Sequence, residues 1–168
     1  MRSAMKTTAL LPIILLLGAA ACSRQNPRLA TTPNQSAALH GDLPANPLAW
    51  QVITSEIDRQ HATMSTLFGN DTAIHYARAN AGHDYPPGSV LSMVTWDQQE
   101  DSRWFGANIP AEPRSVEFVT VGVAPNHEPT YAYREFAGAP LKQTVAIDGS
   151  VPHDRAAYIL SQRAAVMP

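Results

Sequence analysis

The pattern of apolar and polar residues from residue 48 onward predicts one domain built of short strands and helices. Residues 89–96 are apolar on both faces and rich in β-forming side chains, which predicts a central strand. Residues 154–167 place apolar side chains on one helical face, which predicts a C-terminal helix with Ser150 and Pro152 as its cap and first-turn residues. The other predicted elements are helices at 48–57 and 71–79 and strands at 63–68, 104–109, 115–123 and 130–136. The sum is an α+β fold: a mainly antiparallel β-sheet with short flanking helices and a C-terminal helix.

The N-terminus has the pattern of a bacterial lipoprotein signal peptide. Arg2 and Lys6 precede an apolar run that is about half the ~20 residues a membrane-spanning helix needs. Three alanines then lead directly to Cys22, the single cysteine of the chain, and this arrangement resembles a lipobox. We therefore expect residues 1–21 to be a signal peptide and Cys22 to be lipidated. The alternative is an ordinary secretory signal that leaves an incidental cysteine. Ser23, rather than an aspartate, resembles the pattern of lipoproteins sorted to the periplasmic face of the outer membrane.

Composition divides the rest of the chain into a tether and a domain. Residues 22–47 hold few large apolar side chains, so we expect a flexible tether, followed by a folded domain at 48–168. Of the 168 residues, 45% are hydrophobic and 15% charged, which is typical of a globular protein. No basic patch is present, so nucleic acid is not an expected partner. The expected attachment is to a membrane, through lipid.

Four segments of the domain resemble the cytochrome P-460 family. They are residues 65–74 (STLFGNDTAI), 85–90 (YPPGSV), 104–107 (WFGA) and the pair Glu117 and Phe118. The resemblance implies a mainly antiparallel fold with a haem cavity against the sheet. It also implies a c-type haem held by a Cys-x-x-Cys-His motif ahead of the terminal helix. Some members cross-link a lysine to the porphyrin, and members oxidise hydroxylamine or bind nitric oxide.

This chain departs from that pattern at both haem positions. Residues 149–153 read GSVPH where the haem motif is expected, so His153 is kept but both cysteines are missing. The lysine position falls near Met93, and no lysine is present there. With Cys22 assigned to lipid, we expect no covalent haem. Non-covalent haem, with His153 as axial ligand and Trp96, Trp104 and Phe105 lining the cavity, is left open. The alternatives are a first-turn histidine at a helix N-terminus and aromatic side chains that belong to the core.

Other candidate clusters give weaker patterns. The spacing of His61, His75 and His83 with Asp84 fits no compact zinc motif, so no metal site is expected. The acidic residues in 97–101 lack the spacing and glycine of a calcium loop and are predicted to form a solvated hairpin loop. No Gly-x-Ser-x-Gly elbow occurs, so the sequence supplies no motif for hydrolysis.

Two functions follow from these observations. The first is a lipid-anchored cell-envelope protein whose haem-free domain acts as a binding or interaction module. The second is a redox or gas-binding protein, related to hydroxylamine or nitric oxide chemistry, that holds haem non-covalently through His153. Enzymatic activity has no motif of its own in the sequence and rests on the family resemblance alone.

Overall fold

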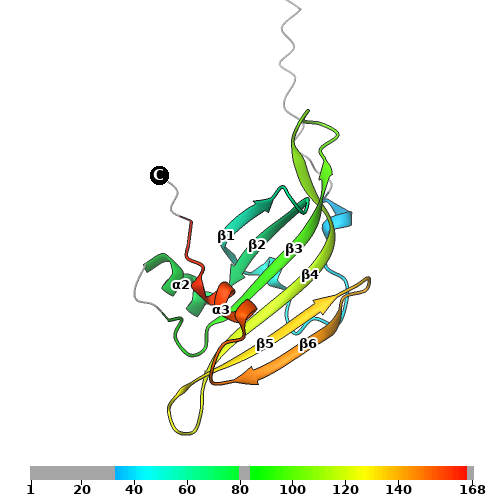
Figure 1. The fold of residues 1–168 in the computed structure, drawn as a ribbon. Helices are drawn as coiled ribbons and strands as arrows, with labels where there is room; N and C mark the ends of the chain where they lie inside the picture. The colour runs from blue at the N-terminus through cyan, green and yellow to red at the C-terminus, as the bar shows by residue number, and fades with distance from the viewer. Residues whose placement is uncertain (1–32, 80–83, 166–168) are drawn as a thin grey trace, which may run out of the picture. The chain divides into compact units, whose positions relative to one another are not determined.

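Six antiparallel strands form one sheet in which every strand lies next to its neighbour in the sequence. The computed structural model describes residues 33–79 and 84–165. The strands are β1 (Gln51–Asp58), β2 (Thr63–Gly69), β3 (Val90–Glu100), β4 (Asn108–Val123), β5 (Pro129–Ala137) and β6 (Lys142–Gly149). Their order in the sheet is β1-β2-β3-β4-β5-β6, so the sheet is a simple meander (Figure 1). The predicted α+β class with a mainly antiparallel sheet is confirmed.

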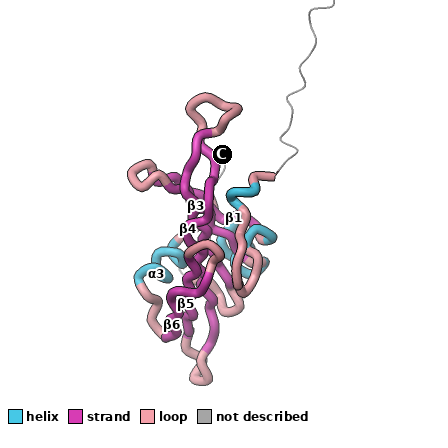
Figure 2. Tube along the Cα trace, turned by 90° about the vertical axis from the view of Figure 1, so that its right-hand side faces the viewer, coloured by secondary structure: helices cyan, strands magenta, loops and turns pink. Residues whose placement is uncertain are grey.

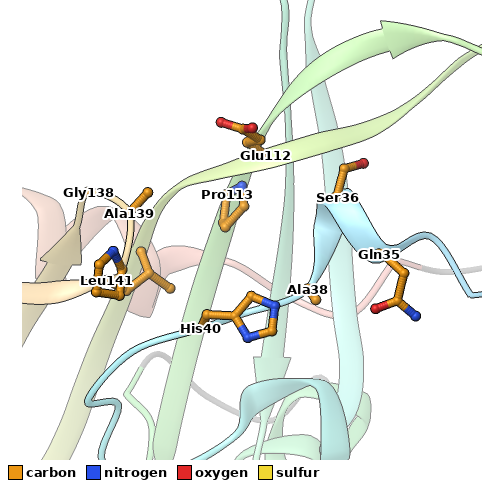
Figure 3. Close-up of a pocket in the computed structure, with 10 residues that line it drawn as sticks. Gln35, Ser36, Ala38, His40, Glu112, Pro113, Gly138, Ala139 and Leu141 are labelled. Atoms are coloured by element: carbon orange, nitrogen blue, oxygen red, sulfur yellow. The ribbon is translucent and has the colours of Figure 1, made fainter.

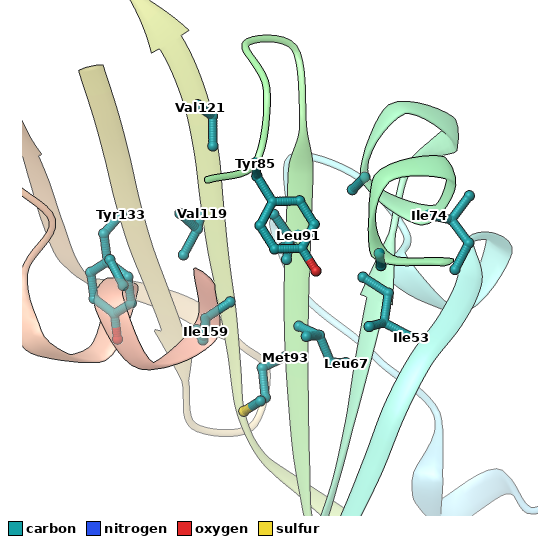
Figure 4. Close-up of a cluster of buried hydrophobic side chains, with 13 residues drawn as sticks. Ile53, Leu67, Ile74, Tyr85, Leu91, Met93, Val119, Val121, Tyr133 and Ile159 are labelled. Carbon is teal, nitrogen blue, oxygen red and sulfur yellow. The ribbon is translucent and has the colours of Figure 1, made fainter. Parts of the chain in front are cut away.

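Two helices cover one face of the sheet. They are α2 (Asp71–Ala79) and α3 (Asp154–Ser161), and their buried alanines and isoleucines pack on side chains of β1 to β5 (Figure 4). Leu67, Leu91 and Val119 are at most 1% exposed in this layer. Small residues such as Ala73 and Ala156 let the helix backbones approach the strands closely, and both are fully buried. This is the helix-covered face.

The opposite face is covered by the N-terminal segment. Residues 34–50, with the short 3₁₀ turns η2 (Gln35–Ala37) and η3 (Pro47–Ala49), cross a cluster that includes Val94, Trp96 and Phe118. Figure 2 shows α3 and this segment on opposite sides of the sheet. The indole Nε1 of Trp96 donates to the carbonyl of Ala37 at 3.0 Å, which satisfies a polar atom that would otherwise be buried without a partner. The central strand β3 is thus buried on both faces, as its apolar run predicts.

Part of the segment that was expected to be a tether packs on the sheet instead. Residues 34–47 were expected to belong to it, yet Gly41 forms a parallel bridge with Leu141, and Asp42 donates to the Leu141 carbonyl at 3.2 Å. The apolar residues of this segment, Ala37, Leu39, Leu43 and Ala45, are few but all pack on the same cluster. The compact unit that contains the sheet begins at Asn34. The rest of the predicted tether lies outside the described residues.

Several predicted boundaries also change. Residues 51–58 form strand β1 instead of a helix; this is an edge strand with Ile53 as its only fully buried residue, so its apolar spacing mimics a helical one. Residues 97–100 extend β3, while residues 104–107 lie in the connecting loop instead of a strand. Strand β6 was not predicted, because this edge strand is exposed along nearly all its length. The cap of α3 is His153, not Ser150 or Pro152, and the helix ends at Ser161.

The close approach at Gly41 gives a test of the N-terminal segment. A Cβ atom there would overlap the Leu141 carbonyl oxygen, and the φ of Gly41 is +150°. Gly41→Ala should therefore displace the segment and lower the free energy of unfolding in urea. Gly88→Ala is the control: its φ is +87° but nothing lies within 4 Å, so only the conformational cost of about 1–2 kcal/mol applies. Equal losses in the two variants would contradict packing of this segment on the sheet.

Candidate functional site

The most distinctive chemistry of the helix-covered face is a buried carboxylate. Glu117 lies in the middle of β4 and its side chain is only 4% exposed. Its Oε1 accepts from the Tyr133 hydroxyl at 2.7 Å and from Arg155 Nε at 2.8 Å, and its Oε2 accepts from Arg155 Nη2 at 2.6 Å. Arg155 thus binds the carboxylate through two nitrogens, the geometry in which an arginine–carboxylate pair is strongest.

The sheet register and the first turn of α3 bring these groups together. Glu117 faces Met93 across β3–β4, and Tyr133 lies diagonally across β4–β5 on the same face. Arg155 is the second residue of α3, and its Nη2 also lies 3.4 Å from the Met93 sulfur. Because Ala156 and Ile159 anchor α3 on the sheet, the guanidinium is held over the carboxylate.

The network continues outward along α3. The guanidinium of Arg155 lies 4.9 Å from the ring centre of Tyr158, whose hydroxyl donates to Glu56 of β1 at 2.6 Å. That hydrogen bond raises the pKa of Tyr158 to about 12. Burial, followed by the hydrogen bond to Glu117, raises the pKa of Tyr133. The hydrogen bond to Glu117 raises the pKa of Arg155. Both phenols therefore stay neutral at ordinary pH and act as hydrogen-bond donors to Glu117 and Glu56.

The four predicted cofactor-binding residues do not come together. His153 is exposed at the N-terminus of α3, where its Nδ1 accepts from the Arg155 backbone N–H at 3.4 Å and its ring lies 5.7 Å from that of Tyr133. Trp96 is buried on the opposite face of the sheet. Trp104 and Phe105 are exposed, at 71% and 110%, in the loop between β3 and β4. His153 and Trp96 instead match the alternative stated in the sequence analysis: the histidine lies at the N-terminus of a helix, and the tryptophan belongs to the core.

The other histidines and acids lie apart. His61, in the turn between β1 and β2, binds Asp58 at 2.7 Å, and this hydrogen bond lowers the pKa of Asp58. His75 is exposed on α2, while His83 lies outside the described residues. Asp97 pairs with Arg114 at 2.6 Å. Within residues 33–79 and 84–165, no three side chains of the His, Cys, Asp and Glu types lie close enough to hold a metal ion.

A cleft of about 320 Å³ lies on the side of the sheet covered by the N-terminal segment (Figure 3). Residues 35–40 form one wall, and the turn between β5 and β6 forms another, around Leu141 and Pro140. Pro113 and Ala38 add apolar surface, while His40 and Glu112 are the ionisable groups. This cleft has the mixture of apolar surface and a few polar groups that small-molecule sites use. The sequence did not predict it, because its walls come from a segment interpreted as tether.

The geometry defines the class of this domain: an antiparallel β-meander with two helices on one face and a buried ion pair beneath the second helix. The family model of cytochrome P460 matches residues 44–148, well over half of the chain. The chain belongs to the cytochrome P460 family. No curated protein matches it. The match ends before His153 and α3, so the expectation for His153 rests on the resemblance alone.

The residues present do not fit the haem of the family's haem-bearing members. Thioether attachment needs cysteine thiols, and the sequence after residue 22 contains none. The residues that the resemblance led us to expect at the positions of the cross-linking lysine and the axial histidine are Met93 and His153. Arg155 touches Met93 through its Nη2 and Glu117 through two nitrogens, so the arginine fills the space in front of Met93.

Breaking the ion pair tests its contribution to stability. Arg155→Met keeps the apolar stem but leaves Glu117 buried without its cation. Removal of one partner of a buried pair costs 3–5 kcal/mol, and we expect about 2–3 kcal/mol here because the Arg155 side chain is 44% exposed. Adding Glu117→Gln should restore part of the loss, since the amide still accepts from Tyr133. Thermal and urea unfolding would measure both.

The matched control is the exposed pair Arg134–Asp148. It is also bidentate, at 2.8 and 3.0 Å, and lowers the pKa of Asp148 through its hydrogen bonds. Because its aspartate is 68% exposed, Arg134→Met should cost less than about 1 kcal/mol. If Arg155→Met costs no more than this control, the buried pair does not hold α3 on the sheet.

Proposed function

We propose that this protein is a lipid-anchored component of the bacterial cell envelope whose cytochrome P460-type domain does not attach haem and acts as a binding module. The observation that carries this proposal is the Glu117–Arg155–Tyr133 cluster. It lies on the helix-covered face close to Met93 and His153, the residues that the resemblance implies for the cross-linking lysine and the axial histidine. A charged, fully hydrogen-bonded cluster there favours a structural use of this face over a cofactor site.

The binding role is supported by the cleft beside the N-terminal segment. Its apolar floor suits a small organic ligand, and the Glu112 carboxylate at its rim suits a ligand with a cationic or hydrogen-bond-donating group. The cleft lies on the opposite side of the sheet from His153. A ligand could therefore be held without any change in the ion pair beneath α3.

Anchoring is supported by the lipobox-like residues before Cys22. Among the residues that the structure describes, no helix has the length and apolar character to cross a bilayer. Lasting attachment by acyl chains needs more than one chain, since each buried methylene contributes only ~0.8 kcal/mol. The lipid on Cys22 would hold the domain at the membrane, on the periplasmic face of the outer membrane if Ser23 directs sorting.

Haem binding gives the first test. Full-length protein purified in detergent from haem-replete cells should show no haem stain after denaturing electrophoresis and no stoichiometric Soret band, even after haem is added. A Soret band that is lost in His153→Ala but kept in His75→Ala, an exposed histidine on α2, would overturn the proposal. That result would favour the alternative of non-covalent haem with His153 as axial ligand.

Lipidation gives the second test. Cells fed an alkyne-labelled fatty acid should incorporate the label into the wild-type protein. In Cys22→Ser the label should be lost and the protein should be released from membranes or remain unprocessed. Ser23→Ala is the control and should keep the label. Full labelling of the Cys22→Ser variant would defeat the lipoprotein proposal.

A further inference from the structure

The β3–β4 hairpin projects beyond the rest of the sheet (Figures 1 and 2). Strand β2 begins at Thr63, which pairs with Asp97, but β3 and β4 continue past that level. They add three further residue pairs, ending at Glu100 and Asn108. At about 3.3 Å per residue, the strands extend roughly 10 Å before the connecting loop begins.

The tip of this hairpin presents two aromatic side chains to solvent. Trp104 is 71% exposed and Phe105 is fully exposed. Single exposed apolar residues are ordinary on protein surfaces, but two adjacent large aromatics at the end of a projection form an apolar tip that nothing in the described chain covers.

The loop holds these side chains outward through its own backbone hydrogen bonds. Asp101 N–H donates to the Ala107 carbonyl at 2.8 Å, and Ala107 N–H donates to the Trp104 carbonyl at 3.0 Å. The Asp101 carboxylate accepts from the Arg103 backbone N–H at 2.8 Å. Gly106 has a φ of +76°, which a glycine adopts without steric cost and which reverses the chain directly after Phe105. The aromatic tip is therefore already formed in the free protein, so little ordering is needed for it to bind.

The start of the ordered chain lies at the base of the same hairpin. Asn34 Nδ2 donates to the Pro110 carbonyl at 2.6 Å, and Gln99 Nε2 donates to Ser36 Oγ at 3.2 Å. The preceding residues must leave from this point. Cys22 is twelve residues before Asn34, so even a fully extended chain limits their separation to about 40 Å. A lipid on Cys22 would therefore limit the distance between the bilayer and the end of the sheet that carries the aromatic tip to about 40 Å.

We propose that Trp104 and Phe105 enter the interface of the phospholipid bilayer to which the chain is anchored, and that they orient the domain with the β3–β4 hairpin toward the membrane. This inference rests on the proposed lipid anchor. Tryptophan suits the boundary between headgroups and acyl chains, since its ring is apolar and its N–H can still bond to polar groups. An acyl anchor together with a second, weaker contact gives stable and oriented attachment.

Charge does not drive this contact. The acidic side chains at this end of the sheet are Asp58, Asp97, Glu100, Asp101 and Glu112, and the arginines are Arg59, Arg103 and Arg114. The acids outnumber the arginines, and Arg103 and Arg114 already lie 3.7 and 2.6 Å from Asp101 and Asp97. The contact should therefore be no stronger on bilayers that contain phosphatidylglycerol than on zwitterionic phosphatidylcholine.

Fluorescence in reconstituted vesicles tests this inference. Full-length protein is inserted into phosphatidylcholine vesicles with or without bromine on the lipid acyl chains, which quenches tryptophans that reach them. Trp96 is 5% exposed in the core and Trp50 packs against Phe118, so Trp104 is the tryptophan within reach of lipid. We expect bromine to quench up to about one third of the emission, since Trp104 is one of three tryptophans. That quenching should be absent in Trp104→Phe and retained in Trp50→Phe.

A second variant tests Phe105. Phe105→Ser should reduce the quenching of Trp104, because the tip loses half of its apolar surface, whereas Val151→Ser, at a residue 79% exposed elsewhere on the surface, should not. Protein that co-sediments with vesicles but shows no quenching would overturn the membrane contact and leave the anchor intact. Protein that neither co-sediments nor is quenched would overturn both. A blue shift of Trp104 emission that depends on protein concentration, without quenching, would indicate a contact between two copies and would also overturn the inference.

Discussion

One buried ion pair links α3 to the middle of the sheet. Glu117 stands in the middle of a strand whose neighbours on the sequence, Val116 and Phe118, are core residues. Burying a carboxylate in that position is unfavourable unless the charge is paired and hydrogen-bonded. Arg155 pairs with it through two nitrogens, and the Tyr133 hydroxyl donates a hydrogen bond to it. The same contacts fix the rotation of α3, because Arg155 can reach Glu117 from only one side of the helix. Packing by Ala156 and Ile159 then completes the helix-covered face.

The two faces of the sheet use different physical means to exclude water. The helix-covered face combines small helical residues with the charged cluster. The other face combines aromatic edge-to-face contacts, such as Phe118 with Phe136 at 5.8 Å, with an irregular segment whose backbone supplies partners for buried polar atoms. The regular cover leaves little space near Met93. The irregular cover leaves the cleft of about 320 Å³, and a smaller cavity of about 190 Å³ lies beside α3, lined by residues that include Tyr85, Pro152 and Leu160.

Sequence reasoning reached the fold class because β3 and α3 carry strong patterns: a strand apolar on both faces and a one-sided helix. Strand β6 was not predicted because an exposed edge strand shows no alternation of apolar and polar residues. Strand β1 was predicted as a helix because only one of its side chains is buried, so its apolar residues do not follow the two-residue period of a strand. The candidate site was harder to predict. Glu117 was noticed only as part of the family resemblance, although an acidic residue within an apolar strand is itself a signal that a cation must lie nearby. The sequence could not name Arg155 as that cation, since the pairing is set by how α3 docks.

The meander order of the sheet also has a consequence for how the chain folds. Each strand pairs with the one made just before it, so every strand pairing in the sheet is antiparallel and needs no crossover connection. During synthesis, which starts at the N-terminus, each hairpin can form once its second strand is complete. Other contacts join late segments to much earlier ones, among them the bridge between Gly41 and Leu141, the hydrogen bond between Tyr158 and Glu56 and the ion pair between Glu117 and Arg155. A chain truncated before β6 would therefore lack α3, and Glu117 would lie in the sheet without its cation.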